Sequence, residues 1–221
     1  MADRTPPTER TRVRRIPERG YYDAASINPI LDEALVCHVA FVHDGQPVSI
    51  PAVHGRIGSD LYLHGSVASR MQRSLAEGIP VAVSVAIVDG FVIGRSILSH
   101  SMNYRSVVLF GVAEAVSDEE EKRAALIAIT NFILPDRWDA IREPTEAEWA
   151  QTHVLRIPLA EASAKIRTGP PIEETEEDYE LDAWAGVIPL RIAASVPVPG
   201  PRQEPTAPVP PDVTGVVERY P

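Results

Sequence analysis

Cysteine is nearly absent from this sequence, which has one, Cys37, in 221 residues. A single thiol excludes an internal disulfide and every zinc or iron–sulfur site that needs several cysteines. Cys37 lies within the apolar run 35–42, so we expect a small core residue rather than a nucleophile.

Long apolar runs are also missing. No stretch approaches the roughly 20 apolar residues that a membrane-spanning helix needs. The first residues are charged and lack the apolar centre of a secretory signal. We therefore expect a cytoplasmic protein without a membrane partner.

Positive charge is scarce, because 21 Lys and Arg stand against 31 Asp and Glu and give a formal net charge of −10. Nucleic acid is not an expected partner, since binding to phosphate polymers needs a basic face. The first twenty residues are the exception and are rich in arginine. Either they form a solvated basic leader, or Arg14 or Arg15 packs over an anionic cofactor or a partner subunit.

Composition divides the chain into four parts. Residues 1–20 are predicted to form a flexible basic arm and residues 21–170 the globular body. An acidic linker with an apolar docking segment follows at 171–195, and 196–221 form a Pro-rich, extended tail.

Short strand-like runs dominate the body, separated by turn signals such as Asp44-Gly45 and Asp89-Gly90. The predicted strands are 35–42, 47–54, 60–64, 80–89, 91–98, 103–116, 152–159 and 163–167, and the predicted helices are 30–34, 66–77, 118–134 and a short one after 144. This order predicts a mainly β protein of the α+β class, a six- to seven-stranded antiparallel barrel with peripheral helices. Neither βαβ units, a dinucleotide glycine fingerprint nor a P-loop is present.

The most informative segment is 61–70, LYLHGSVASR. A strand ends there, Gly65 turns the chain, and a helix is expected to begin with Ser66 at or near its N-cap. Free amide groups at a helix start favour an anion, and Ser66, Ser69 and Arg70 add hydroxyl donors and a forked cation. The segment is a candidate phosphate cradle; the alternative is that Ser66 is a plain N-cap and Arg70 a surface residue.

Two further segments place polar or exposed backbone groups beside strands. Residues 100–108 hold a dense polar group, either in a solvated loop or as ligand contacts at a barrel mouth. Residues 48–54 contain Pro51, which costs a ladder hydrogen bond and belongs at an edge or a bulge. The backbone groups exposed at such a place suit a planar heterocycle such as an isoalloxazine.

Together these segments resemble the FMN-binding split-barrel proteins of the pyridoxamine 5′-phosphate oxidase superfamily, in particular the flavin-nucleotide-binding and nitroimidazole-resistance-like branch. The resemblance covers about residues 14–190. Its better motifs are 64–66 with Ser69-Arg70, then 103–107 and Phe110-Gly111. It implies a split barrel, an FMN cofactor and a homodimer that binds the flavin between its subunits.

The resemblance also assigns contacts to the phosphate, the isoalloxazine and the ribityl chain. The implied cofactor-binding residues are Ile50, Pro51, Ala52, Val53, Leu63, His64, Ser66, Ser69, Arg70, Tyr104, Arg105 and Ser106. Among them, Ser66, Ser69 and Arg70 are expected to hold the phosphate. Residues 104–106 are expected to approach the flavin from the next strands, either within one subunit or across the dimer interface.

The histidines include one candidate catalytic residue, His64, because it adjoins the cradle. A pocket histidine lies near the flavin in nitroimidazole-resistance-like relatives, and His64 or His54 matches it; the alternative is a strand-end histidine bonded to the backbone. His38 and His43 point to opposite faces of one strand and cannot form a local metal pair. No metal site is expected.

The implied function is that of an FMN-dependent oxidoreductase acting on a small organic molecule, for example a nitro-aromatic or quinone-like acceptor. Residues 48–53 lack charge and the C-terminal end is acidic, unlike pyridoxamine phosphate oxidase itself, so that reaction is not expected. The alternatives are a non-catalytic flavin-binding or storage module and a split barrel that binds haem or a deazaflavin in the same groove.

Overall fold

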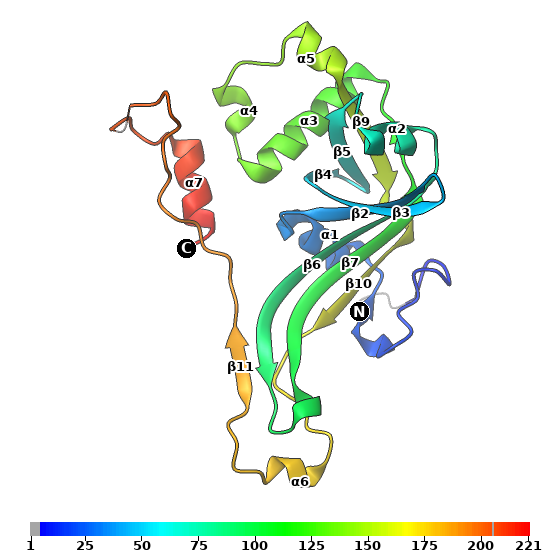
Figure 1. The fold of residues 1–221 in the computed structure, drawn as a ribbon, viewed down its shortest axis with the longest axis vertical. Helices are drawn as coiled ribbons and strands as arrows, with labels where there is room; N and C mark the ends of the chain where they lie inside the picture. The colour runs from blue at the N-terminus through cyan, green and yellow to red at the C-terminus, as the bar shows by residue number, and fades with distance from the viewer. Residues whose placement is uncertain (1–4, 205) are drawn as a thin grey trace.

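The computed structural model describes residues 5–204 and 206–221, and Figure 1 shows its elements. The strands are β1 (Gly20–Tyr21), β2 (Cys37–His43), β3 (Gln46–Ala52), β4 (His54–Ile57), β5 (Asp60–Ser66), β6 (Pro80–Ile93), β7 (Ser101–Val112), β8 (Glu114–Ala115), β9 (Thr152–Pro158), β10 (Ala162–Arg167) and β11 (Gly186–Pro189). The helices are α1 (Ala24–Glu33), α2 (Arg70–Ala76), α3 (Glu119–Ile133), α4 (Arg137–Ala140), α5 (Glu146–Gln151), α6 (Glu176–Tyr179) and α7 (Pro211–Arg219).

Antiparallel pairing builds two sheets. The larger has the strand order β1-β10-β7-β6-β2-β3, with β11 added to β6, and the smaller has the order β4-β5-β9-β8. The chain passes from the larger to the smaller sheet between β3 and β4, at Val53. The predicted mainly β, antiparallel split barrel with peripheral helices is confirmed.

The two sheets bury their facing side chains in one core. Val83 and Val85 of β6 point inward with period two, and Leu61 and Leu63 of β5 meet them from the smaller sheet. Each such side chain contributes roughly 1.5–3 kcal/mol through burial. This core fixes β5, and therefore the turn that follows it, against the larger sheet.

Helix α3 covers the outer face of the smaller sheet. The Asp118 side chain caps it by accepting a hydrogen bond of 2.8 Å from the Glu121 amide. Its buried residue Ile129 packs so closely on β4 that a Cβ placed on Gly55 would lie 2.9 Å from the Ile129 backbone nitrogen. The predicted helix 118–134 is confirmed.

Strand β6 runs unbroken through Asp89-Gly90, where the sequence predicts a turn. A bulge between Val88 and Gly90 takes up the irregularity instead. Glycine is needed there because β11 passes close by, and a Cβ on Gly90 would lie 2.8 Å from the Ile188 carbonyl oxygen. The prediction of two strands, 80–89 and 91–98, is therefore wrong.

Two helices differ from prediction at the ends of the chain. Helix α1 begins at Ala24 rather than Ile30, because Asp23 caps it by accepting a hydrogen bond of 3.0 Å from the Ser26 amide. The tail, predicted to be extended, contains α7, with proline at its first position. An ion pair of 2.7 Å between Arg137 and Asp212 ties α7 to α4.

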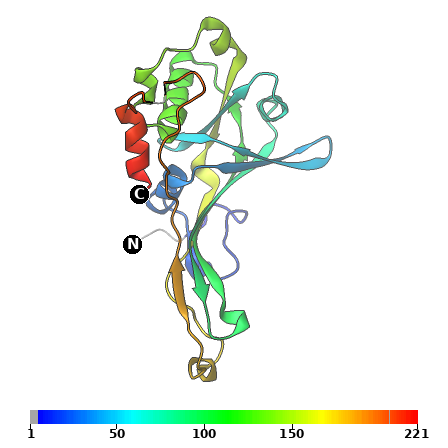
Figure 2. The ribbon, with the colours of Figure 1, turned by 60° about the vertical axis from the view of Figure 1, so that its left-hand side comes forward.

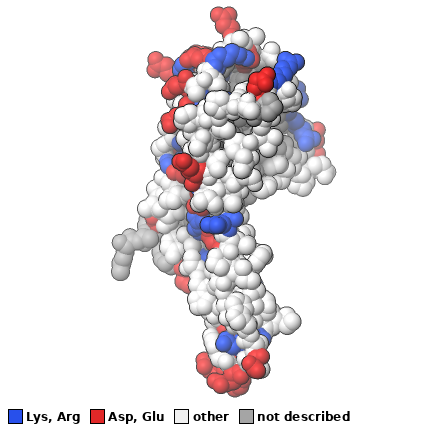
Figure 3. Space-filling model, turned by 90° about the vertical axis from the view of Figure 1, so that its left-hand side faces the viewer, with Lys and Arg blue, Asp and Glu red and all other residues white. Residues whose placement is uncertain are grey.

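Strands β6, β7 and β11 form an arm that extends away from α3, α4 and α5 (Figures 1 and 2). The apolar segment after the acidic run pairs with β6 as β11. Glu173 is buried and accepts a hydrogen bond of 2.8 Å from the Arg95 amide. The other acidic side chains of the run gather at the tip of the arm (Figure 3).

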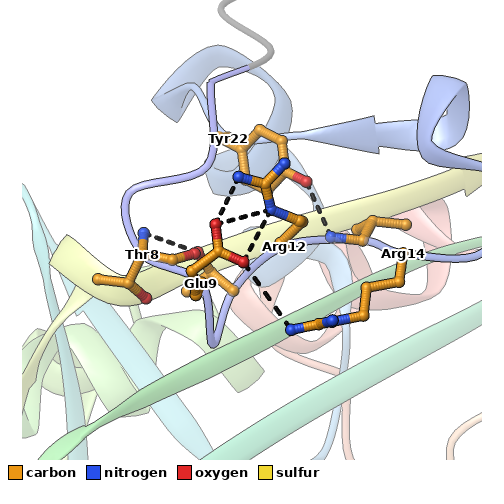
Figure 4. A network of polar contacts seen from close by, with 7 residues as sticks. Thr8, Glu9, Arg12, Arg14 and Tyr22 are labelled. Carbon is orange, nitrogen blue, oxygen red and sulfur yellow. Dashed lines mark hydrogen bonds and ion pairs between the residues drawn. The ribbon is translucent and has the colours of Figure 1, made fainter.

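The described part of the N-terminal segment folds back on the body. Arg10 forms an ion pair with Glu161 and lies 4.9 Å above the ring of Phe110. Glu9 accepts hydrogen bonds from Arg12 and lies 3.8 Å from Arg14, in the network drawn in Figure 4. Arg10 and Glu9 thus tie this segment to the body and to itself.

Within residues 5–204 and 206–221, no helix combines the length and the apolar composition that crossing a membrane requires.

The close approach of α3 to β4 predicts that Gly55→Ala lowers the free energy of unfolding by about 1–3 kcal/mol, because the added methyl group collides with helix backbone. Urea unfolding measures this change. Gly200→Ala is the matched control, since no atom lies within 4 Å of a Cβ at Gly200, and it should shift stability by less than about 1 kcal/mol. Equal effects of the two substitutions would contradict this packing.

Candidate functional site

The turn from β5 into α2 forms the first part of the candidate site, here called the β5–α2 corner (residues 63–73). Leu63 is fully buried and His64 is exposed. Gly65 lies directly against Gln72 of α2, and a Cβ there would sit 3.0 Å from the Gln72 side chain. The absence of a side chain at Gly65 thus lets α2 pack against the end of β5.

Helix α2 begins at Arg70. Its N-cap is Ser69, three residues after Ser66, the predicted N-cap. Ser66 is instead the last residue of β5, and its hydroxyl accepts a hydrogen bond of 3.2 Å from the amide of Ala68 in the turn that follows. The side chains of Ser69, Arg70 and Arg73 have no hydrogen bond or ion pair within the described chain. The corner therefore presents a hydroxyl and two guanidinium groups that are available to an anion.

Strand β3 lies at the edge of the larger sheet, as Pro51 predicts. Ile50 and Ala52 pack against the core, and Val53 packs against the cluster beneath α3. Pro51 is exposed and pairs in register with His38 of β2. Since cross-strand partners project from the same face, Pro51 and His38 are neighbours on the outer surface of the sheet.

The predicted segment 104–106 lies on β7, away from the corner. Asp89 and Glu33 both pair with Arg105, with 3.0 Å between Arg105 Nε and Asp89 Oδ2, and these hydrogen bonds raise the pKa of Arg105. The Ser106 hydroxyl donates to the Lys165 carbonyl at 3.2 Å. Arg105 is thus neutralised by two carboxylates of its own chain.

A groove of about 1110 Å³ crosses the outer face of the larger sheet, and sequence reasoning missed it. It lies between the start of β2, the middle of β6 and β7, and the chain segments after β11 and α7. Its lining includes His38, Arg105, Ser106, Val108, Ile192 and Tyr220. Of the predicted site residues, Arg105 and Ser106 reach this groove, and those of β3 and the β5–α2 corner do not line it.

His54, one of two candidates for the pocket histidine, has a structural role. Its side chain is buried, and its Nε2 donates to the Leu31 carbonyl at 2.9 Å. Its ring lies 5.0 Å from that of Phe132. Burial lowers the pKa of His54, so the imidazole is neutral in the folded protein. His54 therefore joins α1 and α3 to β4 and is unavailable to a ligand.

His64 remains accessible at the corner. Desolvation lowers its pKa, and its ring has no hydrogen-bond partner among the described residues. Cys37, by contrast, is fully buried, and burial raises the pKa of its thiol to about 12. The prediction that Cys37 is a core residue is confirmed.

A family model described as pyridoxamine 5′-phosphate oxidase matches residues 23–166. The chain belongs to this family. The match spans α1 to β10 and leaves out α6, β11 and α7 of this pyridoxamine 5′-phosphate oxidase family member. No curated protein matches its sequence.

Two solved structures resemble this family member over nearly its full length. The flavocytochrome Anf3 from Azotobacter vinelandii is 36% identical, with a TM-score of 0.88 and 98% of each chain covered. The FAD and haem binding protein from Mycobacterium smegmatis is 36% identical, with a TM-score of 0.85, covering 90% of this chain and 97% of that one.

A more distant structure shares the fold alone. It is a 5-nitroimidazole antibiotic resistance protein from Bacteroides thetaiotaomicron, which is 23% identical, with a TM-score of 0.55. The alignment covers 66% of this chain and 86% of that one. The resemblance to the superfamily predicted from the sequence is confirmed by these matches.

The buried, neutral His54 predicts a pH dependence of stability. Its pKa in the folded chain lies below the unfolded value of 6.5, so in that interval the unfolded chain binds a proton that the folded chain does not. The free energy of unfolding therefore falls as the pH decreases below 6.5, with a slope of up to about 1.4 kcal/mol per pH unit.

Urea unfolding between pH 5 and pH 8, roughly the range in which histidine titrates, measures this slope. His54→Gln retains a donor for the Leu31 carbonyl and is expected to flatten it. His100→Gln, at an exposed histidine on the arm, is the control and should leave it unchanged. A wild-type slope in the His54 variant would rule out this assignment.

Proposed function

We propose that this family member is a redox protein that binds a flavin and a haem and passes electrons between them. The observation that carries the proposal is the similarity, over 98% and 90% of the chain, to a flavocytochrome and to a protein named for FAD and haem. Coverage this high includes α6, β11 and the C-terminal segment, which the family model leaves out.

The β5–α2 corner supports binding of the flavin phosphate. Ser66, Ser69 and Arg70 come together where β5 ends, and Ser69 and Arg70 have no partner within the described chain. Arginine forms forked, charge-assisted hydrogen bonds to phosphate, and hydroxyl groups add further donors. We therefore place the phosphate nearest to the ribityl chain at these three side chains.

A flavin with two phosphates matches the corner. Arg73 follows Arg70 by three positions, so that both lie on one side of α2, and both are exposed. Two unpaired guanidinium groups suit a diphosphate better than a single phosphate. Together with the relative named for FAD, this favours FAD. FMN has the same ring and the first phosphate. The prediction from the sequence that FMN is the bound flavin stays a prediction.

The ring is proposed to lie beside β3 and the end of β5. The β4–β5 register pairs His54 with Leu63 and thereby brings His64 next to Val53. Near neutral pH His64 is an uncharged imidazole, because desolvation lowers its pKa. It is the proposed contact for the ring and for a small organic substrate placed there.

Chemistry at such a site comes from the cofactors, since flavins supply hydride and single-electron transfer. This chain's residues bind the ring, orient it and admit the substrate. Tyr104, Arg105 and Ser106 lie away from the corner of their own chain, so their predicted contacts with the flavin require a second copy. A homodimer is therefore part of the proposal.

The proposal is tested on the full chain expressed with added riboflavin and a haem precursor. Absorption spectroscopy is expected to show a flavin band and a Soret band together, and mass spectrometry of the released flavin is expected to identify FAD. A purified protein that takes up neither cofactor on reconstitution would contradict it.

Loss of the corner's donors predicts weaker flavin binding. Ser69→Ala combined with Arg70→Ala is expected to weaken binding by several kcal/mol, because each charge-assisted hydrogen bond contributes about 1.5–3 kcal/mol. Isothermal titration of the deflavinated protein with FAD and with FMN measures the loss. Arg73→Ala should weaken FAD binding more than FMN binding.

Arg202→Ala, at an exposed arginine in the tail, is the control for these titrations and should leave both affinities unchanged. Full flavin affinity in the Ser69/Arg70 double variant would remove the corner from the site.

A further inference from the structure

We propose that the groove on the outer face of the larger sheet binds the haem and that His38 supplies an iron ligand. The inference rests on the proposed function, because it gives the haem of that proposal a location and a ligand. It is carried by the groove's size and lining, by the donor atoms that reach it, and by the chain segments that form its walls.

The groove has the size and polarity of a cofactor site. Its volume of about 1110 Å³ lies just above the range of roughly 300–1,000 Å³ that is usual for small-molecule sites, which leaves room for a large cofactor. Its walls are mainly apolar side chains from the segment before β2, from β6 and β7, and from the segment after β11. These walls are Leu35, Val36, Val88, Val108, Leu190 and Ile192. A large, flat macrocycle with an apolar body fits such a surface.

Two side chains in the lining carry atoms that bind haem iron. Proteins hold this iron through histidine, cysteine, methionine or tyrosine. Of these residue types the described lining has His38 and Tyr220 alone. His38 is exposed on β2 and has no hydrogen bond or ion pair within the described chain. A free imidazole at the wall of an apolar groove is the stronger candidate ligand.

Tyr220 is less well placed as a ligand. Its hydroxyl is buried without a hydrogen-bond partner among the described residues, and Arg219 lies 5.4 Å from the centre of its ring. A phenol that binds iron must lose its proton. A neutral imidazole binds iron without such a step.

Cations at the rim suit the two carboxylates of a haem. Arg191 has no partner within the described chain, and Arg219 donates two long hydrogen bonds of 3.4 Å to backbone carbonyls. Arg105 is already paired with Asp89 and Glu33. The propionates are therefore assigned to Arg191 and Arg219.

The walls of the groove include segments that the family model leaves out. Leu190, Ile192 and Tyr220 lie beyond residue 166, where the family match ends. The two relatives that cover 98% and 90% of this chain are named for a flavocytochrome and for FAD and haem. The match to the nitroimidazole resistance protein covers 66% of this chain. The added segments are thus the part of the molecule that would distinguish a haem-binding member.

The register places this ligand beside the proposed flavin strand. His38 pairs with Pro51, which projects from the same face of the sheet. The proposed iron ligand therefore lies on β2, directly beside β3, the strand proposed to line the isoalloxazine. That arrangement suits electron transfer between the two groups.

The test is a hemin titration of the full chain, purified without haem, with the Soret spectrum and the electron paramagnetic resonance of the ferric form as readouts. His38→Ala is expected to weaken hemin binding by about 10–100-fold or more, since even an outer-shell partner of a metal ligand has an effect of that size. It should also change both spectra. Added imidazole, which replaces the missing ligand, is expected to restore the spectra.

One further variant and the flavin content control for indirect effects. His100→Ala, at an exposed histidine whose ring bonds to the Ser96 carbonyl, should leave hemin binding unchanged. An unchanged flavin content in His38→Ala shows that the barrel is intact.

The outcomes separate this inference from the proposed function. A wild-type spectrum and affinity in His38→Ala, or a spectral change in Tyr220→Phe with none in His38→Ala, would overturn the assignment of His38. A wild-type chain that binds flavin but no hemin would instead refute the haem part of the proposed function.

Discussion

The antiparallel pairing of β6 with β7 is the constraint on which the rest of the structure depends. The pairing runs from Pro80 opposite Val112 to Val92 opposite Ser101, across the bulge after Val88. Its inner half contributes buried side chains to the barrel core, and its outer half projects as the arm. One long hairpin thus serves both as a wall of the core and as the frame for everything built outside it.

The edge of this hairpin also explains where the groove lies. Strand β2 pairs with residues 81–84 of β6, and β11 pairs with residues 90–93. Residues 85–88 pair with β7 on one side, but on the side between β2 and β11 no strand of the described chain pairs with them. The groove lies at this gap in the sheet, and residues 190–192 and 219–221 of the C-terminal segment form its outer wall. The ion pair between Arg137 and Asp212 anchors that segment by fixing α7 to α4.

Local signals made most of the barrel predictable, and long-range contacts explain what was missed. The cap at Asp118 and the capping box of Thr145 with Glu148 each act within one turn, so both are visible in the sequence. Asp89-Gly90 is compatible with a turn and with a bulge, so the local sequence does not distinguish them. Strand β11, which pairs with β6 from Gly90 onward, lies far along the chain. The start of α2 was misplaced because Ser66 and Ser69 are both good N-caps.

The site was predicted in parts for the same reason. The β5–α2 corner spans eleven residues of sequence, and Ser66, Ser69 and Arg70 were named there as candidate phosphate contacts, whereas Arg73 was not. The groove joins His38 to Tyr220, and no local pattern links these positions. The sequence does not reveal that Glu33 and Asp89 pair with Arg105, because these positions are far apart along the chain.

The late addition of β11 has a consequence for biosynthesis. Strand β11, which covers the outer edge of β6, follows the second half of the barrel in the sequence and is therefore synthesised after it. Until then, the nascent chain exposes unpaired amide and carbonyl groups that a second molecule can pair with. Asp89 and Arg95, at the two ends of this stretch, place charges of opposite sign there, and charges on an edge discourage such association. These charges thus oppose pairing of the uncovered β6 edge with a second molecule before β11 is in place.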